Sequence, residues 1–256
     1  MTRSGTPPEK ARTVQSGAKG AQLPAPVRTV DEPVTATRCE LATVADPTRA
    51  GRMSRYMKGV APFFGVPAPL RRHVTRSVRA DALLHNDDAL LEFAGGCFAM
   101  SEREVHYVAV DALEHRSKTL GENTLVRLRG LVQTKSWWDT VDPLSGIVGS
   151  GAVRYAGWRE AMGSWATDPD MWIRRVAILH QLGRGNDTDL DCLFRIVLAN
   201  APDREFFIRK AIGWALRDLA WRQPRTVADF VERHRSDLSP LSVREATKNL
   251  PRLLGP

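Results

Sequence analysis

Apolar residues recur every three or four positions along most of the chain from about Glu32 onward, the spacing of one face of an α-helix. Val105, Val108 and Leu113 show this spacing in the segment 101–116. The apolar segments are roughly 10–18 residues long, and short connections with Gly, Pro, Asp or Asn separate them. We find no convincing strand pattern. The sequence therefore predicts an all-α chain of antiparallel helices.

Capping signals indicate where individual helices begin. Asp46 followed by Pro47 has the form of an N-cap with proline in the first turn. Ser101 and Glu104 have the spacing of a capping box, in which each side chain bonds the backbone N–H of the other. These signals predict helices that start close to residues 47 and 102.

The N-terminal segment differs from the rest of the chain. Residues 1–31 are rich in Gly, Pro, Ser, Thr and charge, so we expect a disordered tail. Residues 32–256 are expected to form a single helical domain. About a dozen similar helices joined in short steps fit an α-solenoid better than a four-helix bundle, and the concave face of such a stack offers a groove for a long ligand.

Composition excludes several classes of protein. Of the 256 residues, 43% are hydrophobic, which is enough for a core. No run approaches the ~18 apolar residues that span a bilayer, and the N-terminus lacks the apolar run of a secretory signal. The cysteines Cys39, Cys97 and Cys192 are far apart and lack metal-site spacing. We expect a cytoplasmic protein with reduced thiols, without a bound metal or cofactor.

The net charge of +8 favours a polyanionic partner, although an ordinary basic surface remains open. Near the C-terminus, Arg244 and Lys248 stand four positions apart and would share one helix face. Closer to the N-terminus, Tyr56 and the pair Arg71 and Arg72 flank a turn rich in Gly and Pro. Such cations suit contacts to phosphate groups.

The segment 135–143 places two tryptophans beside two aspartates. Trp138 and Asp142 are four apart, so on a helix one aromatic plane and one carboxylate converge. Trp137 and Asp139 would point elsewhere and serve packing and capping. Because the residue before a proline is biased away from α geometry, Asp142 could instead cap a helix that begins at Pro143, which would weaken the shared face.

A second candidate surface lies in residues 205–218. Phe206, Lys210, Trp214 and Arg217 stand at positions i, i+4, i+8 and i+11, and so form one helical stripe of aromatic rings and cations. Other residues of the segment supply its apolar face. The stripe favours a surface for phosphates and for a flat or cationic ligand. The alternative is a pair of cations whose stems pack beside a half-buried tryptophan.

Together these segments resemble, in order, the signature segments of the AlkD family of DNA alkylation repair glycosylases. The resemblance runs from about Glu32 to Leu254 and is more specific than any one segment. One departure is Gly183, with Arg184 next, where the family often has a lysine. The five segments are RYMKGVAPFFGVPAPLRR (55–72), SWWDTVD (136–142), WIRRVAILHQL (172–182), EFFIRKAIGWALRD (205–218) and SPLSVREATKNL (239–250).

The resemblance implies a stack of HEAT-like antiparallel helical repeats with a basic concave groove for duplex DNA. Enzymes of this family excise cationic N3- and N7-alkylated purines, such as 3-methyladenine and 7-methylguanine, during base excision repair. They hydrolyse the N-glycosidic bond without base flipping. The expected partner is therefore alkylated duplex DNA, bound by a monomer in the cytoplasm at the nucleoid, with no membrane and no metal.

Carried onto this chain, the resemblance implies that Asp142 is the catalytic carboxylate and that Trp138 and Trp214 are the aromatic walls of the site. Two competing hypotheses remain: a non-catalytic helical-repeat module that binds DNA or protein, and a scaffold without a nucleic-acid role. The residues expected to contact substrate or DNA are Tyr56, Arg175, Phe206, Phe207, Lys210, Arg217, Arg244 and Lys248.

Overall fold

The computed structural model describes residue 1 and residues 29–255, apart from the side chains of residues 82 and 83. Every regular element within this part of the chain is helical, so the all-α prediction is confirmed. The predicted tail lies almost entirely outside the described residues, and its last residue, Asp31, is the first of α1. The helices are α1 (Asp31–Thr43), α2 (Pro47–Tyr56), α3 (Ala68–Val74), α4 (Arg76–Arg79), η1 (Ala82–His85), α5 (Asp87–Ala99), α6 (Arg103–Arg116), η2 (Glu122–Thr124), α7 (Leu125–Val132), α8 (Trp138–Arg154), α9 (Ala156–Trp165), α10 (Met171–Leu179), η3 (Gly185–Asp187), α11 (Leu190–Asn200), α12 (Phe206–Ala220), α13 (Pro224–Arg233), α14 (Pro240–Thr247) and α15 (Leu250–Leu254).

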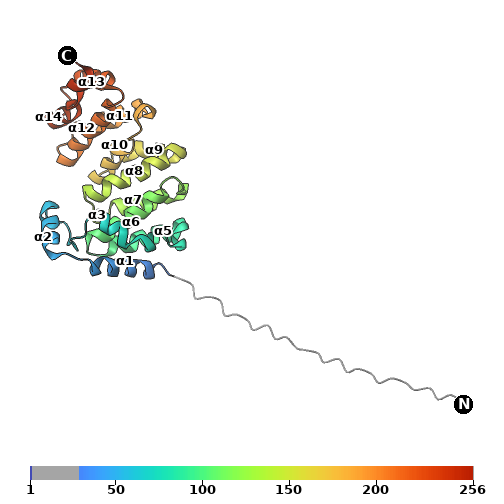
Figure 1. Cartoon of the computed structure of the whole chain (residues 1–256). Coiled ribbons are helices and arrows are strands. Elements are labelled where there is room, and N and C mark those ends of the chain that lie inside the picture. Colours follow the sequence, from blue (N-terminus) through green and yellow to red (C-terminus); the bar gives the residue numbers. More distant parts are fainter. Residues whose placement is uncertain (2–28, 256) are drawn as a thin grey trace.

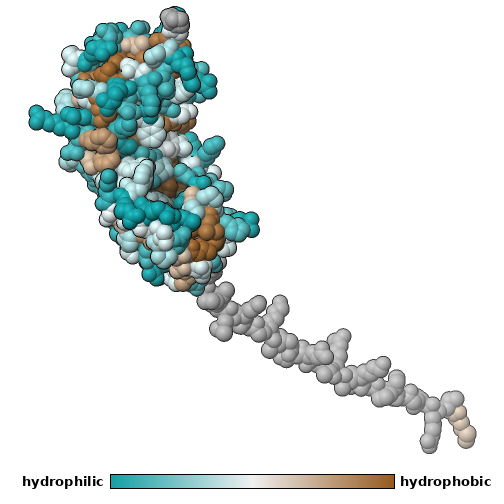
Figure 2. All heavy atoms as spheres, turned by 60° about the vertical axis from the view of Figure 1, so that its left-hand side comes forward, coloured by the Kyte–Doolittle hydropathy of each residue, from teal (hydrophilic) through white to brown (hydrophobic). Residues whose placement is uncertain are grey.

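From α5 onward the helices form a two-row stack, as expected for a helical-repeat solenoid (Figure 1). The helices α6, α8, α10, α12 and α14 contact one another in that order, and we call them the even row. Each of them also packs against one to three of the helices α5, α7, α9, α11 and α13, which we call the odd row. Toward the left of Figure 1, α2 and α14 project beyond α8. The face that carries these helices is mostly hydrophilic, with separate hydrophobic patches (Figure 2).

The core lies between the two rows, where aliphatic side chains of successive helices interlock. Leu113, Leu144, Ile178 and Leu216, one from each of four even-row helices, have at most 1% of their surface exposed. Burial of this kind supplies most of the stability of a helical stack, because short helices are marginal alone. In the described part of the chain, no helix is both long and apolar enough to cross a bilayer.

The predicted start of α2 is confirmed. Asp46 is the N-cap, its carboxylate accepts a hydrogen bond of 2.9 Å from the backbone N–H of Arg49, and Pro47 opens the helix. Proline is tolerated there because the first helical N–H has no intrahelical acceptor. The local sequence was therefore sufficient to predict where α2 begins.

The predicted capping box at α6 is wrong. Glu102 is the N-cap, and neither Ser101 nor Glu104 makes a capping bond. The Glu104 carboxylate instead accepts three hydrogen bonds of 2.8–3.0 Å from the backbone N–H groups of residues 64–66. Within that turn Gly65 has φ +87° and lies where a Cβ would be 2.1 Å from a backbone oxygen. Glu104 thus fixes the turn between α2 and α3. This role depends on a tertiary contact and not on the local sequence around Glu104.

Two buried histidines should make the stability fall in mild acid. Burial lowers the pKa of His106 and that of His180 from 6.5 to about 4. Between these values the unfolded chain binds protons that the folded chain does not. The free energy of unfolding should therefore decrease as the pH falls from 6.5 toward 4, by up to ~1.4 kcal/mol per pH unit for each histidine.

Urea denaturation at a series of pH values from 7 down to 5 measures this slope. A His180→Gln variant should be less stable at neutral pH but show a shallower slope. An unfolding free energy that does not change across this range would contradict the prediction.

Candidate functional site

The segment with two tryptophans and two aspartates forms the start of α8. The helix begins at Trp138 and continues through Pro143, so Asp142 lies inside it and does not cap a new helix. Trp138 and Asp142 line the same cavity, whose volume is about 290 Å³. The predicted shared face is therefore present, and the alternative that depended on Pro143 is excluded.

The other walls of this cavity, which we call the central cavity, come from α10 and α12. The stripe predicted on residues 206–217 faces it as one set, because positions four apart stack on one side of a helix. Every lining residue was a candidate from the sequence. They are Trp138, Asp142, Arg175, Phe206, Phe207, Lys210, Trp214 and Arg217.

Asp142 is held in a bidentate ion pair with Arg175 of α10. The guanidinium Nε and Nη2 atoms donate to the two carboxylate oxygens at 2.7 and 2.9 Å, and Nη1 donates to the carbonyl of Phe207. Burial raises the pKa of Asp142, whereas the Arg175 charge and hydrogen bonds oppose that rise. We infer that the pair keeps an ionised carboxylate in a largely dry position, since an unpaired one would be neutralised there.

Arg175 itself has only 3% of its surface exposed. Its guanidinium is engaged with protein acceptors on both of its terminal nitrogens and on Nε. The expected contact between Arg175 and the DNA backbone stays a prediction. Its visible role is to orient Asp142.

The neighbouring residues Trp137 and Asp139 point away from the central cavity. Trp137 packs against Phe207 and Trp172, with ring centroids 4.9 and 5.8 Å apart, so its expected packing role is confirmed. Asp139 makes no capping bond, contrary to expectation. Its carboxylate accepts from Arg103 at 2.6 and 3.0 Å. That ion pair fixes the first turn of α8 to α6.

Tyr56 lies on the other side of Trp138, as expected for a residue near the site. The residue is 73% exposed, and its ring meets the Trp138 ring edge-on, with centroids 6.3 Å apart. Between α2 and α8 there is a second cavity of about 390 Å³. Trp138 separates this cavity from the central one. It is lined by Arg49, Arg52, Met53, Tyr56, Met57, Phe63, Tyr107, Trp138 and Asp139.

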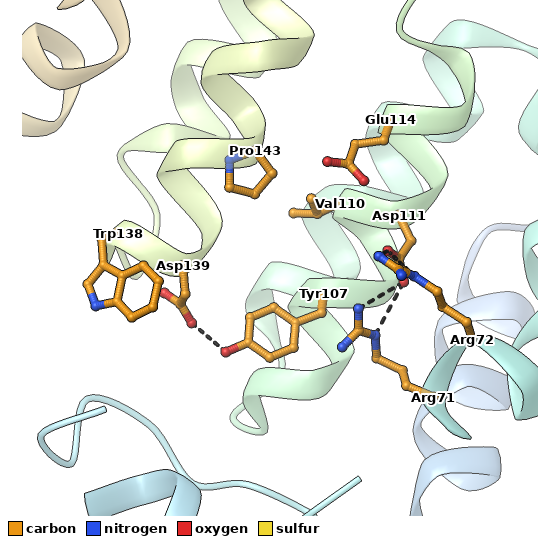
Figure 3. A pocket seen from close by; sticks show the side chains of 9 residues that line it. All are labelled: Arg71, Arg72, Tyr107, Val110, Asp111, Glu114, Trp138, Asp139 and Pro143. Carbon is orange, nitrogen blue, oxygen red and sulfur yellow. Dashed lines mark hydrogen bonds and ion pairs between the residues drawn. The ribbon is translucent and has the colours of Figure 1, made fainter. Parts of the chain in front are cut away.

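A third cavity, of about 250 Å³, also includes Trp138 and is drawn in Figure 3. Three of its polar residues, Tyr107, Asp111 and Glu114, come from α6 and were not predicted. Their spacing of i, i+4 and i+7 was a usable signal for one shared helix face. Trp138 lines all three cavities, which therefore lie next to one another around its indole.

Arg244 and Lys248 are exposed at α14, but neither is among the residues that line the three cavities. The side chain of α14 that reaches the central cavity's cations is Glu245, which was not predicted from the sequence. Its carboxylate accepts from Lys210 at 2.6 Å and from Arg217. The two cations predicted for phosphate contact therefore share an acidic partner.

Gly183 and Arg184, where the sequence departs from the family pattern, both make hydrogen bonds to other helices. Gly183 adopts φ +78° and its N–H donates to the Asp218 carboxylate at 2.8 Å. Arg184 donates to the carbonyl of Gly149 at 2.6 Å. Arg184 thus links α8 to the start of η3.

In the described residues, no group of three or more acidic, His or Cys side chains is arranged to hold a metal ion.

Comparison with known proteins covers the whole of this region. A family model described as DNA alkylation repair enzyme matches residues 37–250. A solved structure titled "Predicted DNA alkylation repair enzyme from Enterococcus faecalis" is 30% identical, with a TM-score of 0.74, over 80% of this chain and 95% of that one. No curated protein matches. The matched range contains every residue that lines the three cavities.

Proposed function

Because the chain belongs to the family of DNA alkylation repair enzymes, we propose that it is a DNA glycosylase for cationic N3- and N7-alkylated purines in duplex DNA. One observation carries this proposal. The Asp142 carboxylate, held in its bidentate pair with Arg175, faces a cavity with the indoles of Trp138 and Trp214 in its walls. An anion between aromatic faces is suited to a positively charged base and to a positively charged transition state.

The chemistry follows from the charge of the substrate. Alkylation at N3 or N7 makes the purine cationic, so the C1′–N9 bond can break with its electron pair leaving on a neutral base. Positive charge then develops on the sugar, and Asp142 stabilises it and orients the water whose oxygen adds to C1′. The water loses its proton to solvent or to the carboxylate. No general acid is required, because the leaving group is already activated.

The aromatic walls add selectivity. Trp138 and Trp214 would each attract a desolvated cationic nucleotide by roughly 0.5–2 kcal/mol. Two further cavities adjoin the central one at Trp138, and this row of adjacent hollows supports access by a nucleotide that is still within the duplex. A site of this shape needs no base-flipping pocket, and one copy of the chain would be sufficient.

Selectivity for charged lesions is the test of this proposal. The chain should release 3-methyladenine and 7-methylguanine from methylated duplex DNA faster than they are lost spontaneously. It should release no uracil or hypoxanthine, because these neutral bases are poor leaving groups without a general acid. Chromatography of the released bases measures both, with duplex affinity measured in parallel at several salt concentrations.

Two results would count against the proposal. A chain that binds duplex DNA but releases no base is a non-catalytic binding module on the same scaffold. A chain that releases neutral bases equally well must protonate its leaving group, which would require a general acid that we have not identified.

A further inference from the structure

Glu245 of α14 bridges the two cations that α12 presents to the central cavity. Its Oε1 atom lies 2.6 Å from the Lys210 ammonium, and its Oε2 accepts from the Arg217 guanidinium. The Glu245 side chain is 13% exposed, whereas those of Lys210 and Arg217 are 38% and 22% exposed. The carboxylate therefore lies beneath its two partners.

The close packing of α12 on α14 brings this carboxylate to its two partners. A Cβ at Gly213 would lie 2.4 Å from the Cβ of Glu245 and 2.9 Å from the carbonyl oxygen of Ser242, so glycine at 213 allows the two helices to approach this closely. Hydrogen bonds from Lys210 and Arg217, together with the positive charges of these two side chains, hold the pKa of Glu245 below its usual value, so its carboxyl group is ionised at neutral pH. The bridge is therefore a fixed part of the site.

The bridge changes the charge that surrounds the central cavity. Lys210 and Arg217 add two positive charges to the walls, while Arg175 is balanced by Asp142. Positive walls favour a phosphate but oppose both a cationic base and a cationic sugar. The negative charge of Glu245 reduces the two positive charges of Lys210 and Arg217 to a net charge of +1.

We propose that Glu245 is a specificity-determining residue: it restrains the attraction of Lys210 and Arg217 for undamaged backbone and weakens the repulsion that these two cations exert on a cationic base. This inference rests on the proposed function, because it takes alkylated DNA as the ligand of the cavity. Undamaged DNA offers only phosphates, for which the carboxylate competes. An alkylated purine brings a positive charge, which the carboxylate favours.

A similar arrangement lies on the other side of Trp138. Asp111 accepts from Arg71 at 3.1–3.2 Å and from Arg72 at 3.0 Å (Figure 3). Cations on both sides of the central cavity are thus paired with internal carboxylates. Glu245 is the one whose two partners line the cavity that contains Asp142.

A Glu245→Gln variant tests the inference, because glutamine keeps the shape and removes the charge. Affinity for undamaged duplex should rise by about 3- to 10-fold at low salt, and the slope of log K against log salt should steepen by ~0.9, the value for one additional phosphate contact. Single-turnover release of 7-methylguanine should slow by about 3- to 10-fold, since the cavity becomes more positive. The two effects have opposite signs, whereas a loosened fold would lower both affinity and rate.

Two further variants serve as controls. Glu232→Gln removes an equal charge from an exposed ion pair with Arg235 near the end of α13, in the odd row, and should change neither quantity. Glu245→Asp keeps the charge and should stay closer to wild type in both. Thermal melts confirm that each variant is folded at the assay temperature.

The inference is overturned if Glu245→Gln matches Glu232→Gln, because the bridge would then have no effect on DNA. It is also overturned if Glu245→Gln binds undamaged duplex more weakly, since the carboxylate would then order the cations for phosphate. Failure of the proposed function is distinct: the wild-type chain itself would release no purine, and the inference would fall with it.

Discussion

Replacing Asp142 by asparagine should slow the release of 3-methyladenine and 7-methylguanine by about 100- to 1,000-fold, while duplex affinity changes by only a few fold. The reason is electrostatic. Asparagine has nearly the shape of aspartate but cannot offset the positive charge that develops on the sugar. Phosphate contacts, which set the affinity for duplex DNA, do not involve this carboxylate. Single-turnover base release and fluorescence anisotropy with the same duplex measure the two quantities.

This variant also leaves Arg175 buried without its partner, so it needs a matched control. Removing one member of a buried ion pair typically costs ~3–5 kcal/mol of stability. Asp139→Asn makes the same substitution three residues earlier in α8, in a buried pair with Arg103. Both variants should be destabilised. At a temperature where both are folded, Asp142→Asn should lose much more base release than Asp139→Asn, because Asp139 acts only through the turn that carries Trp138.

Equal loss of base release in the two variants would contradict the catalytic role. In that case displacement of the start of α8 would explain both results, and Asp142 would be a structural partner of Arg175. Thermal melts of both proteins, recorded before the assay, set the temperature at which the comparison is valid.

Replacing Arg103 by methionine should lower the free energy of unfolding by ~3–5 kcal/mol. Arg103 is 1% exposed, and its guanidinium donates to the Asp139 carboxylate, to Thr140 Oγ1 at 3.0 Å and to the Lys135 carbonyl at 2.7 Å. Methionine fills much of the space but leaves the Asp139 charge buried and uncompensated. The expected loss is therefore larger than for an exposed ion pair, which contributes ~0–1 kcal/mol.

Urea denaturation measures this loss, and a second substitution tests its cause. Combining Arg103→Met with Asp139→Leu removes both charges and should recover a large part of the stability. If the single variant loses less than about 1 kcal/mol, the network does not hold α8. If the double variant is no better than the single one, packing of the arginine stem explains the loss.

This network also matters for the site, because it sets the position of Trp138. Lys135 adopts φ +46°, an uncommon conformation for a residue with a side chain, just before α8 begins. The Arg103 guanidinium donates to the carbonyl of Lys135 and also to the carboxylate of Asp139, which lies in the first turn of α8. These hydrogen bonds therefore hold the backbone that carries Trp138, whose indole lines all three cavities.

The sequence alone was sufficient for features that depend on neighbours within one helix. The apolar period predicted the all-α stack, and the spacing of four predicted that Trp138 and Asp142 share a face. The stripe from Phe206 to Arg217 followed from the same geometry. These features are predictable because a helix places residues three or four apart on one side, whatever it packs against.

Only the tertiary structure decided which charges are paired. Asp142 meets Arg175 across 33 positions of sequence, and Glu245 meets Arg217 across 28. Glu104, which had the spacing of a capping box, binds the turn at residues 64–66 instead. With 37 basic and 29 acidic residues, the sequence permits many pairings. The packing of one helix row on the next selects among them, because a buried charge is stable only beside the partner that the fold brings to it.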